Sequence, residues 1–140
     1  MEKNPTYLFV AAAALIDEAG RILVQKRPEG KPLPGLWEFP GGKVEAGETP
    51  ESALVRELRE ELAIVVHIPD IVPVAFASEA LADRHLILLL YKCLCWAGDI
   101  RSPDGLELQW LPVEALHDLP MPPADGPLVH QLSQSLRSRS

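Results

Sequence analysis

Three glutamates, Glu57, Glu60 and Glu61, are the residues of this chain whose type and spacing best suit chemistry. At helical spacing, positions i, i+3 and i+4 share one face, so the three carboxylates would lie close together. Carboxylates at such separations repel one another and raise each other's pKa unless a cation joins them. Oxygen ligands suit Mg²⁺ or Mn²⁺, and Mg²⁺ held by carboxylates usually has a substrate phosphate as a further partner. The cluster therefore predicts a divalent metal site that serves a phosphorylated substrate.

The residues around the glutamates predict the helix that would position them. Thr49 is a favoured N-cap, and the proline after it fits the first helical position. Leu54, Leu58 and Leu62 recur every four residues and predict a buried stripe beside the acids. We therefore expect a helix that packs through its leucines, presents its acids to a cleft, and ends by about residue 63.

Apolar, β-compatible runs separated by Gly, Pro and Asp turn signals predict strands on both sides of this helix. This order of elements indicates one α+β domain spanning residues 1–140, with helices packed on a mixed sheet. The predicted strands cover residues 7–16, 21–26, 36–40, 64–68, 72–77, 85–96 and 106–111, and helical segments are predicted at 113–119 and 127–136.

Composition and charge exclude several classes of function. The net charge is −7, and an acidic chain lacks the surplus of Lys and Arg that binding a nucleic-acid polymer requires. A small phosphorylated ligand remains compatible, because a metal ion can neutralise its charge. The longest apolar run, Leu86–Tyr91, is too short to span a bilayer. We expect a soluble, cytoplasmic protein that is a monomer or a weak homodimer and does not bind membranes.

Residues 42–64 resemble the Nudix box, whose pattern is G-x5-E-x7-R-E-U-x-E-E-x-G-U, with U an aliphatic residue. The chain has Gly42, then Glu48, then the run Arg56-Glu57-Leu58-Arg59-Glu60-Glu61 at the required spacings. One position departs from the pattern, because Ala63 stands where the box has glycine. The resemblance implies an α/β/α sandwich and a Mg²⁺-dependent hydrolase of nucleoside diphosphates linked to another group, with Mn²⁺ as a possible substitute.

The similarity extends beyond the box to the MutT branch of the Nudix family, whose members hydrolyse oxidised guanine nucleotides such as 8-oxo-dGTP. It covers nearly the whole length of the chain. The matching stretches outside the box are residues 25–27, 36–42, 83–85 and 121–125.

The resemblance also implies roles for the acids and glycines. Glu57 would contact the nucleophilic water as metal ligand, base or both, with Glu60 beside it. Glu48 and Arg56 would pair across the turn and hold the loop against the helix. The implied metal ligands are the Gly41 carbonyl and the side chains of Glu57, Glu60, Glu61 and Asp104.

For the nucleotide, the resemblance implies contacts from Arg27, Glu38, Phe39 and Asp125. Phe39 would line the base pocket. We assign Trp37 to the core and expect its ring and the Phe39 ring to face opposite sides of their short strand.

Three positions depart from the family pattern. Ala63 replaces a glycine at the helix end, which affects stability by roughly 1 kcal/mol. Asp104 stands where the family has a ligating Glu, so it is either a shorter ligand or a turn-forming Asp-Gly. Asp125 stands where the family has an Asn that reads the oxidised purine. It can accept hydrogen bonds from a guanine ring, cap the following helix, or do both.

We therefore expect a Mg²⁺-dependent pyrophosphohydrolase that cleaves 8-oxo-dGTP or a related nucleoside triphosphate to the monophosphate and pyrophosphate. Two alternatives stay open. One is a Nudix enzyme for another nucleotide, such as a CTP derivative, a nucleotide sugar or a dinucleoside polyphosphate. The other is a non-catalytic nucleotide-recognition domain, which the retention of all three box acids disfavours.

Overall fold

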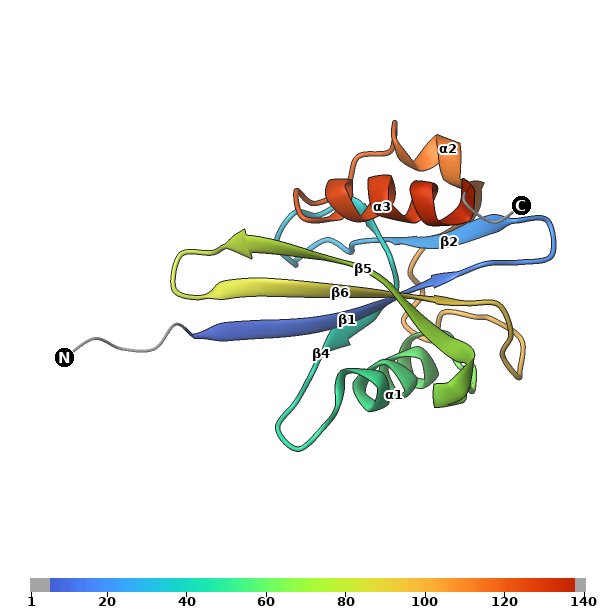
Figure 1. Cartoon of the computed structure of the whole chain (residues 1–140), viewed down its shortest axis with the longest axis horizontal. Coiled ribbons are helices and arrows are strands. Elements are labelled where there is room, and N and C mark those ends of the chain that lie inside the picture. The colour runs from blue at the N-terminus through green and yellow to red at the C-terminus, as the bar shows by residue number, and fades with distance from the viewer. Residues whose placement is uncertain (1–5, 138–140) are drawn as a thin grey trace.

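A computed structural model describes residues 6–137 and contains two β-sheets with helices on either side (Figure 1). The first sheet has four strands in the order β4-β1-β6-β5. Strands β1 and β6 run parallel, and the other neighbours are antiparallel, which makes the sheet mixed. Its strands are β1 (Tyr7–Leu15), β4 (Gly41–Lys43), β5 (Ile71–Ala80) and β6 (His85–Cys93).

A smaller antiparallel sheet and the helices complete the fold. The second sheet has the order β3-β2-β7, with β2 (Arg21–Lys26) in the centre. Helix α1 lies against one side of the first sheet, and α2 and α3 lie on the other side (Figure 1). The α+β class with a mixed sheet is thus confirmed. The remaining elements are β3 (Trp37–Glu38), α1 (Pro50–Leu62), the 3-10 helix η1 (Ile68–Asp70), β7 (Leu108–Pro112), α2 (Val113–Leu116) and α3 (Asp125–Arg137).

The alanine-rich strand β1 separates two hydrophobic cores. Because side chains alternate along a strand, Ala12 and Ala14 face the core under α3, whereas Ala11 and Ala13 face the core under α1. Both faces are fully covered there, and small side chains let the helices approach closely. Helix α1 closes its core with the three predicted leucines, Leu54, Leu58 and Leu62, all of them fully buried.

Both ends of α1 form as its sequence predicts. The Thr49 hydroxyl accepts a hydrogen bond from the Ser52 N–H at 3.1 Å, and the Ser52 hydroxyl accepts one from the Thr49 N–H at 3.0 Å. These reciprocal bonds are a capping box. At the other end Ala63 adopts a left-handed conformation, with φ 58°, and its N–H donates to the Arg59 carbonyl. An L-residue with a Cβ is therefore held in a backbone geometry that glycine adopts more easily.

Two strand predictions need correction. Residues 64–68 do not form a strand: Val65 makes one isolated bridge with Ala97, and the chain then turns into η1, where Pro69 has no N–H to donate to a ladder. Conversely, Gly41–Lys43 lies outside every predicted strand and forms strand β4. Its glycines carry no β-propensity, and its position is fixed instead by pairing with β1.

Candidate active site

The two-glycine segment Gly41-Gly42 and two of the α1 glutamates meet at one place. Strand β4 brings Gly42 so close to Glu57 that a Cβ on this glycine would lie 2.3 Å from the Glu57 carboxylate carbon. The Gly41 N–H donates to Glu61 Oε2 at 3.1 Å. The side-chain amide of Gln25 donates to the same oxygen at 3.4 Å. Glu57 and Glu61 therefore flank a stretch of backbone from which side chains are sterically excluded.

The Glu61 carboxyl is largely buried here and has no cationic partner among the described residues. Burial raises the pKa of Glu61 to about 7, and the nearby charges of Glu57 and Glu38 add to the increase, whereas the Gly41 N–H and the Gln25 amide oppose it. Within residues 6–137, no Lys or Arg forms an ion pair with Glu61. A bound cation would stabilise the ionised carboxylate here.

Arg56 connects the loop before α1 to the carboxylates on it. Its guanidinium donates to both carboxylate oxygens of Glu48, at 2.7 and 2.9 Å, which confirms the predicted pair. The hydrogen bonds from Arg56, with a further one from the Glu45 N–H, lower the pKa of Glu48 to about 2. Arg56 also donates to Glu57 at 2.9 Å, to the Lys43 carbonyl at 3.1 Å and, more weakly, to Glu60 at 3.4 Å.

The three box acids do not converge as closely as their spacing suggests. The Glu60 side chain is 61% exposed and turns toward Arg56, whereas the Glu57 side chain is 16% exposed. In the described chain, no three His, Cys, Asp or Glu residues form a group able to hold a metal ion. The donor set still fits a hard divalent cation, because Glu57 and Glu61 offer carboxylate oxygens beside the Gly41-Gly42 backbone. Glu60 and the Gly41 carbonyl stay predicted ligands.

Asp104 lies in a turn, and within the described residues it forms no metal-binding group of three with the α1 acids. The Gly105 N–H bonds to the Ser102 carbonyl at 3.0 Å, and the Leu106 N–H bonds to the Ser102 hydroxyl at 2.8 Å. Asp104 is exposed and lines a hollow of about 340 Å³ together with Lys26 and Arg27. The structure therefore has the turn-forming geometry, and a role as metal ligand stays a prediction.

Arg27 is fixed at the end of β2 by contacts on both sides of its guanidinium. It donates to Glu38 at 2.7 Å and to the Pro32 carbonyl at 2.7 Å. The backbone also links Arg27 to Leu36 and Gly35, which closes the proline-rich loop between β2 and β3. Arg27 and Glu38 thus form an ion pair, Arg27 also lines the hollow, and their contacts with a nucleotide stay predictions.

The two aromatic side chains around β3 share one core, contrary to the expectation that they face opposite sides. Trp37 is 8% exposed and Phe39 is 5% exposed, and both pack in the cluster under α3. Residues two apart in an extended segment share a face, so Phe39 follows Trp37 into the same core although strand β3 ends at Glu38. Phe39 is therefore in the core as well as near the predicted nucleotide residues, and its contact with a base stays a prediction.

Asp125 begins α3 and is almost completely buried. It is 4% exposed, and within residues 6–137 its carboxylate makes no hydrogen bond or ion pair, so the helix-capping bond is not formed. Burial raises the pKa of Asp125 from an ordinary 3.8 to about 7; Glu38 and Glu79 contribute to the increase, and Arg27 opposes it. A buried carboxyl without partners has both oxygens available for a ligand.

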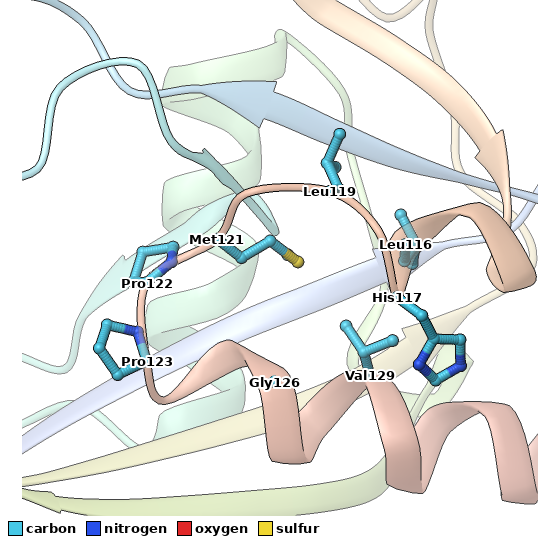
Figure 2. A pocket seen from close by; sticks show the side chains of 8 residues that line it. All are labelled: Leu116, His117, Leu119, Met121, Pro122, Pro123, Gly126 and Val129. Carbon is cyan, nitrogen blue, oxygen red and sulfur yellow. The ribbon is translucent and has the colours of Figure 1, made fainter.

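The loop between α2 and α3 determines where Asp125 lies. The Asp125 N–H donates to the Pro122 carbonyl, and the Trp37 N–H donates to the Pro120 carbonyl at 2.8 Å, which ties the loop to β3. Figure 2 shows Met121, Pro122 and Pro123 on this loop, arching over the first turn of α3. A cavity of about 190 Å³ lies between this loop and the helices α2 and α3.

We predict that Asp125→Asn changes the pH dependence of stability. Between pH 3.8 and about 7 the folded state keeps a proton on Asp125 that the unfolded state has released, so wild-type stability falls as pH rises through this window. Asparagine does not titrate. The free energy of unfolding of the variant relative to wild type should therefore increase by ~2–3 kcal/mol between about pH 5 and about pH 8. Urea denaturation at both pH values measures it; an unchanged difference would show that Asp125 titrates normally.

Two residues of the site, Gln25 and Glu79, were not predicted. Gln25 is 3% exposed, and its side-chain amide donates to Glu61. The sequence feature that could have indicated this contact is a polar residue directly after the apolar run of β2. Glu79 lies on β5, and its charge raises the pKa of Asp125. No sequence pattern links two positions so far apart in the chain.

These features define a nucleotide-hydrolase type of site: a helix with paired carboxylates, a two-glycine strand against it, and a separate buried carboxyl near an arginine. The chain belongs to the Nudix family, because the NUDIX domain model matches residues 6–132.

No helix within the described residues has the length and apolar character needed to cross a bilayer.

Two curated relatives are equally similar in sequence. The 8-oxo-dGTP diphosphatase of Haemophilus influenzae is 38% identical over 88% of this chain and 89% of its own length. The CTP pyrophosphohydrolase of Escherichia coli K12 is 38% identical over 84% of this chain and 85% of its own length. Among solved structures, the Escherichia coli ORF135 protein superposes with a TM-score of 0.85 at 33% identity, covering 96% of this chain and 94% of the other. The chain is thus a Nudix pyrophosphohydrolase of the MutT-like kind.

Proposed function

We propose that the protein is a Mg²⁺-dependent nucleoside triphosphate pyrophosphohydrolase, with 8-oxo-dGTP or a related cytoplasmic (d)NTP as its substrate. The observation that carries this proposal is the placement of Glu57 and Glu61 on either side of the Gly41-Gly42 backbone. Curated relatives named 8-oxo-dGTP diphosphatase support the choice of substrate. Removal of such nucleotides would keep damaged precursors out of DNA.

The residues of the chain supply complementary parts of the reaction. Glu57 and Glu61 would hold the divalent cation. When bound, the cation supplies neutralisation of the phosphate oxygens and a lowered pKa for water. Glu57 is oriented by Arg56, whose Nη1 donates to it at 2.9 Å, and would receive the proton of the attacking water. Water adds at the β-phosphorus and the bond to the bridging oxygen of the α-phosphate breaks, which releases a nucleoside monophosphate and pyrophosphate.

A cytidine nucleotide is the second candidate substrate. One observation favours it: Asp125 is a buried carboxyl without partners, and a protonated carboxyl can donate to cytosine N3 while it accepts from the N4 amine. A curated CTP pyrophosphohydrolase is as similar in sequence as the 8-oxo-dGTP enzyme.

A panel of nucleotides tests the proposed function. The purified protein is incubated with Mg²⁺ and 8-oxo-dGTP, dGTP, CTP, nucleotide sugars or dinucleoside polyphosphates, and products are resolved by ion-exchange chromatography. We expect equimolar monophosphate and pyrophosphate from a triphosphate, and no turnover after chelation with EDTA. Release of inorganic phosphate instead of pyrophosphate, or turnover that survives EDTA, would contradict the proposal. The ratio of kcat/KM for 8-oxo-dGTP and CTP decides between the two substrates.

A further inference from the structure

Three carboxylates from three separate elements interact electrostatically at the start of α3. Asp125 comes from α3 itself, Glu38 from β3 in the second sheet, and Glu79 from β5 in the first sheet. Asp125 is the most buried of them, at 4% exposure, and lacks a hydrogen-bonding partner among residues 6–137. Burial is the main cause of the raised pKa of Asp125, and the charges of Glu38 and Glu79 add to it. Both glutamates therefore lie within electrostatic reach of the buried carboxyl.

The β5 register shows why Glu79 faces this place. Glu79 pairs with Leu86 of β6 and lies two residues after Ala77, a buried member of the core under α3. Side chains two apart on a strand share a face, so Glu79 is on the α3 side of the sheet. Helix α3 lies along β5 (Figure 1), and Gln131 donates to the Phe76 carbonyl at 3.3 Å. Within the described chain, the Glu79 side chain forms no hydrogen bond or ion pair.

The positive charge available to these carboxylates is limited. Arg27 is the cation that opposes the raised pKa of Asp125. Its guanidinium is already bound to Glu38 and to the Pro32 carbonyl, each at 2.7 Å. Asp125 and Glu79 thus keep acceptor oxygens to which no described side chain donates, and the negative potential around them favours a ligand that presents N–H groups.

Nucleobases differ in what they could present. Cytosine and guanine carry an exocyclic amine that donates hydrogen bonds, whereas uracil has a carbonyl at the corresponding position and hypoxanthine has only hydrogen. An exocyclic amine can donate hydrogen bonds to the carboxylate oxygens of Asp125 and Glu79. A carbonyl at that position would place another acceptor beside them and leave them without a donor. An unsatisfied buried acceptor costs about 1–3 kcal/mol, which corresponds to a preference of roughly 5- to 150-fold.

We infer that Glu79, together with Asp125, makes the base subsite selective for nucleobases that carry an exocyclic amine. This inference rests on the proposed function, in which Asp125 contacts the base. Glu79 is a specificity-determining residue in this assignment and takes no part in hydrolysis, because it lies on the α3 side of the sheet while Glu57 and Glu61 lie with α1 and β4.

Binding of nucleoside monophosphates tests the inference without relying on turnover. Isothermal titration calorimetry compares CMP with UMP and GMP with IMP, in the presence of Mg²⁺, for wild type, Glu79→Gln and a control, Glu18→Gln. Glu18 is an exposed residue of the β1–β2 turn. We expect wild type and the control to prefer the amine-bearing member of each pair by about ten-fold or more. Glu79→Gln, which keeps the size of the side chain, should weaken this preference several-fold while UMP affinity stays within about two-fold.

Two results would overturn the inference. Equal affinities of wild type for CMP and UMP, and for GMP and IMP, would show that the subsite does not read the amine. An unchanged preference in Glu79→Gln would show that Glu79 does not contribute. Neither result bears on the proposed hydrolysis, which is tested separately by pyrophosphate release from the triphosphate panel.

Discussion

Glu57→Gln should lower kcat by ~10²–10⁴-fold while the protein stays folded. Glutamine has nearly the same shape, so it can occupy the narrow space against Gly42 and still accept the hydrogen bond from Arg56. It lacks the negative charge that would hold a divalent cation and receive a proton from water. The chemical step should therefore suffer much more than folding or nucleotide binding.

Steady-state pyrophosphate release measures the effect on kcat, and thermal unfolding measures whether the protein stays folded. Glu45→Gln is the matched control, because Glu45 is an exposed acid in the loop before α1. Its kcat should equal that of wild type. A Glu57→Gln enzyme within ten-fold of wild type would remove Glu57 from its proposed role, and a large drop in melting temperature would mean that its contribution is structural.

Gly41→Ala should destabilise the fold by ~3 kcal/mol or more. An added Cβ would lie 2.1 Å from the Ala11 carbonyl oxygen and 2.7 Å from the Ala12 Cα. These atoms belong to the backbone of β1, which is held between β4 and β6 and cannot move aside. The φ angle of +154° adds strain for any residue with a side chain. The added methyl group must therefore separate β4 from β1.

Gly47→Ala separates this steric effect from the effect of backbone conformation. Gly47 also has a positive φ, +84°, but a Cβ there would meet nothing within 4 Å. Its replacement should cost only about 1 kcal/mol. Urea denaturation of both variants gives the comparison. If Gly41→Ala loses no more stability than Gly47→Ala, the contact with β1 does not restrict position 41.

The sequence predicts those parts of the molecule whose signals are local. Helix α1 follows from Thr49, the proline after it and the leucine repeat, and the pair of Glu48 with Arg56 follows from the box. Strand β4 does not follow, since its glycines are placed by contact with β1, which is distant in sequence. The same holds for Glu79, which approaches Asp125 only after β5 has packed beneath α3.

Other differences arise where a local rule applies but tertiary packing overrides it. The i, i+3, i+4 spacing places Glu60 near Glu57, yet Arg56 binds Glu60 at the exposed side while Glu61 turns to the Gly41 N–H. Trp37 and Phe39 share one core, as residues two apart on a strand do, and the expectation that they face opposite sides is wrong. Burial of Asp125 also depends on the α2–α3 loop, whose path no short motif specifies.

Strand β1 lies between the acids of α1 and the carboxylates around α3, and this arrangement has an evolutionary consequence. With the base bound at Asp125 and Glu79, as inferred above, substitutions on the α3 side would alter which base is accepted without displacing the residues that would cleave the phosphate chain. Preference for a new nucleotide can then arise in a few steps from an enzyme that remains active throughout. A scaffold built in this way can diversify into many sanitising and housekeeping activities from one ancestral hydrolase.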